Sequence, residues 1–292
     1  MKDKIVYALG FFDGVHLGHQ ALLTACRHMA QRLGCKAGAV TFRTHPEAVV
    51  TGKAPKLINT PGDRARLLMG YDMEDLLELN FDEKLRSRHW QAFLEDLLAL
   101  GAAGFVCGDD FRFGYRGEGN AETLAAFCRE RNIPYAVVAA QNLEGVRISS
   151  THIRSLLEAG ELEEANRFLG HPHLLTGRVI HGRQLGRTIG IPTANLALPE
   201  ETVVPKFGVY ACTAIVDGSR YAAVTNVGTR PTVDGHHITV EPWLLDFDGD
   251  LYGKHLTLRF HSFLRPEQKF ASLEDLKAQI QKDAVKVRQL LK

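Results

Sequence analysis

The stretch KIVYALGFFDGVHLGHQALL, residues 4–23, sets the architecture of the first half of this chain. In it a short apolar run leads into three glycines at four-residue intervals and two histidines three residues apart, and then into an apolar helical pattern. The run predicts a buried strand, and the glycines predict a sharp turn that a ligand can approach closely. A helix that begins near Gly18 presents free backbone N–H groups, so the turn is a candidate anion site.

The two histidines, His16 and His19, flank the predicted start of this helix. A lone histidine is most often structural, but two imidazoles beside a glycine at a strand-to-helix turn favour hydrogen bonds to phosphate oxygens. The spacing matches neither the P-loop pattern nor the dinucleotide pattern GxGxxG. We expect Gly10 and Gly14 to form the turn and Gly18 to leave room beside a bound phosphate.

Strand-like runs alternate with helical patterns up to about residue 170, which predicts an α/β domain with a parallel sheet covered on both faces. Thr60 is the expected N-cap of one helix and Ser87 of another. The helix after Ser87 has one apolar face. The predicted strands lie in residues 4–10, 36–42, 76–81, 104–111 and 134–140.

The pattern after residue 170 predicts an antiparallel sheet or barrel. Two β-rich runs are joined by Asp217-Gly218, a strong hairpin signal, and further runs lie in residues 176–182, 236–247 and 254–264. A last helix is expected to begin after Ser272, with Leu273, Leu276, Ile280 and Val287 on its apolar side. We place the domain boundary near residue 172, which gives domains of residues 1–172 and 173–292.

Composition narrows the functional classes. A chain of 292 residues predicts two domains, and a net charge of +1 gives no reason to expect a nucleic-acid partner. The five cysteines form no C-x-x-C pair, so neither a disulfide framework nor a zinc site is indicated. No apolar run reaches the roughly 18 residues of a membrane span, so we expect a cytoplasmic protein without a membrane partner. The oligomeric state is not indicated.

Two further segments of the first half are candidate ligand sites. In RISSTHIR, residues 147–154, Ser149, Ser150 or Thr151 could simply cap a helix, or the hydroxyls and Arg154 could clamp a second phosphate. In CGDDFRFG, the adjacent Asp109 and Asp110 follow a predicted strand, and by themselves they indicate only a solvated turn.

The second half holds a Gly-rich basic segment, GRQLGRTIGIPTANLALP, residues 182–199. Its backbone N–H groups could wrap phosphates, which makes Gly186, Arg187 and Gly190 candidate ATP-binding residues. The Thr193 hydroxyl and the Asn195 amide oxygen could bind Mg²⁺, although Thr and Asn after a proline most often form a turn.

The motifs GFFDGVHLGH, GDDFRFG and ISSTHIR, in this order, resemble the nucleotidyltransferase half of the bifunctional bacterial riboflavin kinase/FMN adenylyltransferases, also called FAD synthetases. The resemblance implies a Rossmann-like domain in which FMN attacks the α-phosphorus of ATP and pyrophosphate leaves, with no covalent enzyme intermediate. It implies that His16 and His19 contact the ATP phosphates and that Thr151 and Arg154 hold the pyrophosphate. The other implied residues are Phe12, Asp13 and Ser150 for ATP and Asp109, Asp110 and Phe111 for the flavin.

The segment around IPTAN resembles the riboflavin kinases of the same family, and FGVYACT, TNVGTRPT, VEPWLLDFDGDLYG and FLRPEQKF follow in the family's order. The resemblance implies a six-stranded barrel with Thr193 and Asn195 on Mg²⁺, Arg265 near the flavin, and Glu241 as the base that takes the proton of the riboflavin 5′-hydroxyl. Two positions depart from the family pattern: Thr44 replaces a proline in TFRTHP, and Pro242-Trp243 replaces Thr-His after Glu241.

Three functions stay open at this level. The first is an enzyme that makes FMN and then FAD from riboflavin and ATP. The second is an enzyme in which a single domain is active or the first domain takes another phosphorylated substrate. The third is a flavin-binding carrier or regulator with degenerate sites, which the retention of His16, His19, Arg154, Thr193, Asn195 and Glu241 disfavours.

Overall fold

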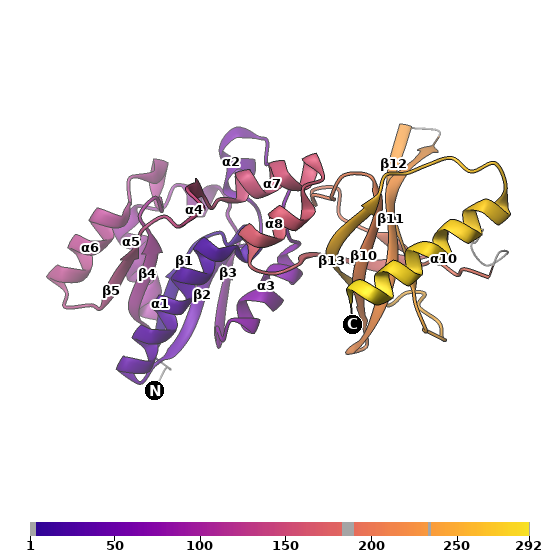
Figure 1. Cartoon of the computed structure of the whole chain (residues 1–292). Helices are drawn as coiled ribbons and strands as arrows, with labels where there is room; N and C mark the ends of the chain where they lie inside the picture. Colours follow the sequence, from indigo (N-terminus) through magenta and orange to yellow (C-terminus); the bar gives the residue numbers. More distant parts are fainter. Residues whose placement is uncertain (1–3, 183–189, 233–234, 292) are drawn as a thin grey trace. The chain divides into compact units, whose positions relative to one another are not determined.

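The structure is a computed structural model, and it describes residues 4–182, 190–232 and 235–291. The chain divides into two compact units, one of residues 1–55 and 64–150 and one of residues 56–63 and 151–292 (Figure 1). Each unit has its own sheet and its own hydrophobic clusters. No helix in the described ranges has the length and apolar character needed to span a membrane.

The first unit is built on the expected parallel sheet. Five strands lie in the order β3-β2-β1-β4-β5, and every neighbouring pair is parallel. Carboxyl ends of parallel strands share one edge, so the segments that follow β1 and β4 lie at the same edge. The strands are β1 Ile5–Leu9, β2 Lys36–Phe42, β3 Asp75–Leu79, β4 Ala102–Gly108 and β5 Tyr135–Val138.

Both faces of this sheet are buried, as the all-apolar strands predict. Alternate side chains of β1 enter different cores: Tyr7 packs in a cluster with residues of α5 and α6, and Ala8 in a cluster with residues of α1. The helices and short elements are η1 Asp13–Val15, α1 Leu17–Leu33, α2 Pro46–Thr51, α3 Pro61–Gly70, α4 Glu83–Arg86, α5 Trp90–Leu100, η2 Tyr115–Gly117, α6 Ala121–Glu130, β6 Asn142–Leu143 and β7 Val146–Arg147.

One of the two predicted helix caps in this half is confirmed and the other is wrong. The Asp63 amide donates to the Thr60 hydroxyl at 3.1 Å, and Pro61 is the first residue of α3. Ser87, in contrast, ends the short helix α4, which Asp82 caps through the Leu85 amide. Helix α5 therefore begins two residues later than a cap at Ser87 would place it, and His89 occupies its N-cap position.

The second unit is the expected antiparallel sheet of six strands, in the order β12-β11-β10-β13-β8-β9. Asp217 and Gly218 join β10 to β11 with φ values of 49° and 80°, the left-handed pair of a two-residue hairpin turn. The Ala194 amide, just before end strand β9, donates to the Pro242 carbonyl of end strand β12 at 2.9 Å, so the sheet curls toward a closed barrel. The strands are β8 His173–Ile180, β9 Asn195–Ala197, β10 Gly208–Val216, β11 Ser219–Thr232, β12 Gly235–Leu244 and β13 His255–Arg265.

Three helices accompany this sheet: α7 Ser150–Ala159, α8 Leu162–Leu169 and α10 Leu273–Leu290. Ser272 caps α10 through the Asp275 amide, as expected. Ala284 and Val287 of this helix pack in one cluster with residues of β10 and β11. The predicted apolar side is partly wrong, because Leu273 is 59% exposed.

Candidate active sites

The turn after β1 has a backbone that its residue types make possible. Phe12 and Gly14 both adopt left-handed conformations, with φ values of 59° and 84°. The Phe12 ring is fully buried in the core and lies so close to Gly10 that a Cβ there would meet it at 3.0 Å. The packing of the Phe12 ring against Gly10 therefore shapes the turn. Asp13, the next residue, is also buried.

His16 and His19 form one stacked unit at the start of α1. The His19 amide donates to Nδ1 of His16 at 3.2 Å, and the two rings stack with centroids 3.6 Å apart. Because Nδ1 of His16 accepts this bond, the proton of the neutral ring sits on Nε2. A Cβ at Gly18 would meet the His16 ring at 3.2 Å. Gly18 therefore makes room for the His16 ring, which differs from the expected room beside a ligand.

His19 is held in its neutral form. Burial lowers its pKa well below the usual value, and the positive charges of His16 and Arg64 lower it further. The edge of its ring meets Phe12 at a centroid distance of 5.3 Å. Its Nδ1 atom has no hydrogen-bond partner within the part of the chain that the structure describes. A neutral imidazole with an unused ring nitrogen is suited to hydrogen bonding with a ligand.

The segment before α7 is joined to this turn. The Ser150 hydroxyl donates to the Asp13 carbonyl at 2.9 Å, so this last residue of the first unit is held at η1. Gly18 lies near Ile148 of the same segment. Thr151 and Arg154 follow on α7, and by their contacts they belong to the second unit. Thr151 is exposed and Arg154 is half-buried.

Asp109 and Asp110 lie directly after β4, at the sheet edge that also carries the turn after β1. Both are exposed, and both carboxylates have protein partners: Asp109 accepts from the Ala140 amide at 3.0 Å, and Asp110 pairs with Arg147 at 2.5 Å. Phe111 stacks on Phe113 and packs against the core. Their predicted contact with the flavin stays a prediction.

Arg64 is a residue of this site that the sequence did not single out. Its side chain is fully buried, its Nη2 donates to the Phe42 carbonyl, and its guanidinium lies 4.4 Å from the centre of the Phe11 ring. The available signal is spacing: Arg64 precedes the buried Leu68 by four residues, so both occupy one face of α3.

In the second unit, the Thr193-Asn195 segment lies beside the strand that carries Glu241. The Ala194 amide, between Thr193 and Asn195, donates to the carbonyl of Pro242, the residue after Glu241. This hydrogen bond joins the two segments. Pro242 lacks an N–H, and its strand β12 stands at the end of the sheet order, as Pro242 favours. Thr193, Asn195 and Glu241 are all partly exposed, so a ligand can reach them.

Most of the Gly-rich segment before IPTAN, including Gly186 and Arg187, lies outside the described residues. Gly190 is described: it is exposed, with a left-handed φ of 74° and open space around it. Its conformation suits a loop that turns sharply, and its phosphate contact stays a prediction.

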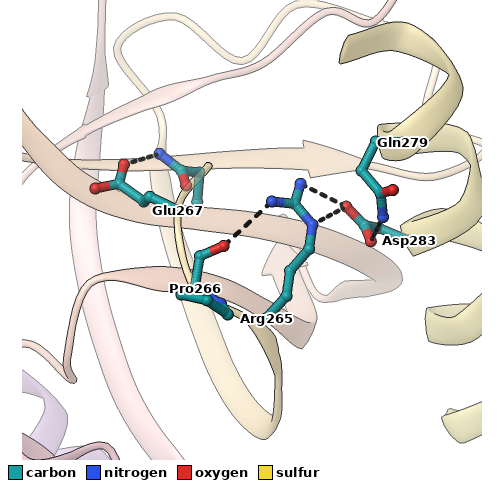
Figure 2. Close-up of polar contacts among 6 residues, drawn as sticks. Arg265, Pro266, Glu267, Gln279 and Asp283 are labelled. Carbon is teal, nitrogen blue, oxygen red and sulfur yellow. Dashed lines mark hydrogen bonds and ion pairs between the residues drawn. The ribbon is translucent and has the colours of Figure 1, made fainter. Parts of the chain in front are cut away.

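Arg265 is engaged within its own unit. Its Nε and Nη2 donate to one Asp283 oxygen at 3.0 and 2.8 Å, and its Nη1 donates to the Pro266 carbonyl at 3.3 Å (Figure 2). Asp283 is fully buried and also accepts from Gln279. The guanidinium thus joins β13 to α10, and flavin binding by Arg265 stays a prediction.

Glu267 is a second residue that the sequence did not single out. Its carboxylate accepts from the Asn226 amide at 3.3 Å, and Asn226 faces Glu241 across β11 and β12. A Cβ at Gly228 would collide with the same carboxylate, so the glycine makes this approach possible. Glu267 is therefore placed to orient the cross-strand neighbour of Glu241.

The donor set near Thr193 fits magnesium. A hydroxyl and an amide oxygen are hard ligands, and Mg²⁺ in nucleotide sites takes one or two protein oxygens and completes its shell with phosphates and water. Gly182 supports the set, because a Cβ there would collide with the Asn195 amide. Among the described residues, no group of three or more His, Cys, Asp or Glu side chains could hold a metal ion.

Comparison with known proteins identifies the family of both halves. A family model for FAD synthetase matches residues 1–152, and one for riboflavin kinase matches residues 169–291. A bifunctional riboflavin kinase/FMN adenylyltransferase from Listeria monocytogenes is 37% identical over 95% of this chain and 90% of its own. One from Pseudomonas fluorescens is 40% identical over 98% and 92%. The chain belongs to this bifunctional family.

The candidate residues are divided between the two matches to this riboflavin kinase/FMN adenylyltransferase family. The FAD synthetase match contains His16, His19 and Thr151, the riboflavin kinase match contains Thr193 and Glu241, and Arg154 falls between the two. A crystal structure described as a macrolide-efflux protein from Streptococcus pneumoniae has a TM-score of 0.87 and 32% identity, and the match covers 99% of this chain and 95% of that one. Its name describes that protein, whereas both family models name flavin enzymes.

Proposed function

We propose that each half of this riboflavin kinase/FMN adenylyltransferase carries one reaction: residues 173–292 phosphorylate riboflavin, and residues 1–172 adenylylate the FMN produced. The main support is that the FAD synthetase match contains His16 and His19, whereas the riboflavin kinase match contains Thr193, Asn195 and Glu241. ATP is a substrate in both reactions. A cytoplasmic location, the absence of a nucleic-acid or membrane partner, and the division at residue 172 belong to the same proposal.

In the kinase reaction the riboflavin 5′-hydroxyl attacks the γ-phosphorus of ATP, ADP leaves, and Glu241 takes the hydroxyl proton. Thr193 and Asn195 would hold Mg²⁺ through their side-chain oxygens, and the metal when bound neutralises phosphate charge. The hydrogen bond between Ala194 and Pro242 supports this assignment, because it ties the metal-binding segment to the strand of the base. Asn226, held by Glu267, faces Glu241 and can orient the carboxylate.

In the adenylyl transfer the FMN phosphate attacks the α-phosphorus of ATP, and the bond to pyrophosphate breaks. His16 and His19 donate hydrogen bonds to the phosphates, and Thr151 and Arg154 bind the leaving pyrophosphate. No covalent enzyme intermediate is needed, so the enzyme accelerates the reaction by positioning the reactants and neutralising the phosphate charge. Asp109, Asp110 and Phe111 are the proposed flavin-side residues, at the edge where β1 and β4 both end.

A product assay with matched variants tests the division of labour. The purified chain, given riboflavin and ATP with Mg²⁺, should form FMN and FAD, and added EDTA should stop both reactions. His19→Ala should lower FAD formation about 100-fold or more and leave FMN formation unchanged, because it removes a donor to the phosphates. Glu241→Gln should lower FMN formation about 100-fold or more, while supplied FMN is still converted to FAD.

Exposed residues of the same types provide the controls. His28→Ala lies on the same helix as His19, and Glu200→Gln lies on the surface of the second unit, so both should retain both activities. If the folded His19→Ala and Glu241→Gln chains each lost both reactions, one reaction per half would be excluded. A wild-type chain that bound flavin and formed neither product would support the carrier hypothesis.

A further inference from the structure

Arg64 combines a buried charge with unused hydrogen-bond donors. The side chain has no exposed surface, yet within the described residues its Nε and Nη1 atoms have no hydrogen-bond partner. Its hydrogen bond runs from Nη2 to the Phe42 carbonyl. A buried guanidinium is ordinarily paired or hydrogen-bonded in full, so this arrangement is costly unless a ligand completes it.

The surroundings of Arg64 belong to the adenylyl-transfer site. The Phe11 ring, in the turn after β1, lies over the guanidinium at 4.4 Å. The positive charge of Arg64 acts on His19, because it helps to lower the pKa of that imidazole. Asp13 and Glu78 favour the charged guanidinium, while burial acts against it. All of these residues lie in the first unit.

The histidines alone cannot neutralise a triphosphate. His19 is held neutral, and two stacked imidazoles 3.6 Å apart do not both take protons readily. They offer hydrogen bonds without a permanent charge, whereas an arginine stays charged throughout the usable pH range. In a site of low dielectric, one such cation attracts phosphate groups over several ångströms.

We propose that Arg64 supplies a permanent positive charge of the adenylyl-transfer site, in addition to that of Arg154, and holds the ATP phosphates, and the pyrophosphate formed from them, against the His16–His19 turn. The inference rests on the proposed function of the first half. It makes Arg64 a positioning residue for that reaction, distinct from the histidines and from Arg154. The alternative is that Arg64 is purely structural, as a link between α3 and the Phe42 carbonyl.

Four variants of the full chain separate these two roles. Arg64→Gln and Arg64→Met remove the charge, Arg64→Lys keeps it, and Arg66→Gln changes an exposed arginine of the same helix. We expect both neutral variants to raise the KM for ATP in FAD formation about 10-fold to 100-fold, the range for a lost hydrogen bond to a charged group. Arg64→Lys should recover most of the affinity, and Arg66→Gln should match the wild type.

Two readouts keep the test independent of turnover and of folding. Titration calorimetry with inorganic pyrophosphate and Mg²⁺ should show weaker binding to the neutral variants by a similar factor, and riboflavin phosphorylation by the same samples should be unchanged. The inference is overturned if the neutral variants bind pyrophosphate as the wild type does, if they fail to fold, or if Arg64→Lys is as impaired as they are. A wild-type chain that binds pyrophosphate but makes no FAD from FMN would contradict the proposed function instead.

Discussion

The behaviour of single residues in the first site follows from what surrounds them. The His16 and His19 rings can stack because Gly18 has no Cβ, and the bond from the His19 amide fixes which His16 nitrogen carries the proton. Burial then keeps His19 neutral. His19 is therefore a preorganised neutral hydrogen-bonding group, and such groups are most effective when they do not have to reorient during the reaction.

A different histidine should make the second unit sensitive to acid. His173 is fully buried at the start of β8, and burial together with the charge of His171 lowers its pKa to about 3. The unfolded chain binds a proton near pH 6.5, so it holds more protons than the folded chain between these pH values. Stability from the neutral ring is therefore complete above pH 6.5 and is lost as the pH falls, by about 1.4 kcal/mol per pH unit.

Urea unfolding at several pH values checks this expectation. Between pH 6 and pH 4, the free energy of unfolding should fall more steeply with pH for the wild type than for His173→Phe. The two slopes should differ by the binding of about one proton, roughly 1.4 kcal/mol per pH unit. His255→Gln removes an exposed histidine and should keep the wild-type slope. Equal slopes for the wild type and His173→Phe would show that His173 titrates normally in the folded chain.

The sequence singled out several residues of the first site and missed Arg64, and the contacts that these residues make with ligands stay predictions. His16, His19 and the glycines share one short motif, so their proximity could be anticipated, whereas the contact of Ser150 with the turn depends on the tertiary fold. Arg64 is distant in sequence and lies on a helix where an arginine is ordinarily solvated. Its burial depends on how α3 packs against the sheet, which no local pattern encodes.

At the scale of elements, strands and caps with strong local chemistry were predicted correctly. The apolar runs became parallel strands, and Asp217-Gly218 and Thr60 have the expected roles. The prediction that Ser87 caps a helix start was wrong, because Ser87 ends the short helix α4, which was not predicted. The three-residue strand β9 was missed, because its backbone partners are in β8 and its sequence carries no alternation long enough to detect.

Helix α10 departs most from its amphipathic pattern. The pattern predicts Leu273 on the buried side, but the described structure exposes Leu273 and buries the Asp283 carboxylate completely. Asp283 is buried because it forms an ion pair with Arg265 (Figure 2). The Arg265 side chain is itself only 15% exposed. Helical periodicity cannot reveal that Arg265 of β13 is the partner of Asp283. The pattern therefore gives no sign that Asp283 is buried.

Breaking this ion pair should destabilise the second unit strongly. Asp283→Ala leaves the Arg265 guanidinium without its carboxylate, so we expect a loss of about 3 kcal/mol in the free energy of unfolding. The double variant Arg265→Met with Asp283→Leu should recover most of this loss, because no charge is then left buried. Trp243 fluorescence can report the unfolding in a Trp90→Phe background, since the chain has 2 tryptophans.

An exposed ion pair near the same helix serves as the control. Arg288 pairs with Asp246 at 2.7 Å, and both side chains are largely exposed. Arg288→Ala should therefore cost less than about 1 kcal/mol. If Asp283→Ala were no more destabilising than Arg288→Ala, the Arg265–Asp283 pair would contribute little to holding α10.

At the scale of the whole molecule, the product of one half is the substrate of the other. In the proposed function FMN forms at Glu241 and is consumed at His16 and His19, and these residues belong to different units with separate sheets. FMN must leave the kinase site before it can be adenylylated. Once released it is a soluble small molecule, so the second reaction need not occur in the same chain.

Mixing two inactivated chains tests this reasoning. The His19→Ala chain makes FMN and the Glu241→Gln chain consumes it, so an equal mixture with riboflavin, ATP and Mg²⁺ should form FAD after a lag in which FMN accumulates. Either chain alone at twice the concentration should form almost none, which controls for residual activity. Chromatography of timed samples gives both flavins directly. If the mixture formed no FAD while each chain remained active on its own substrate, FMN would have to pass between sites without release, and the two halves could not act as independent enzymes.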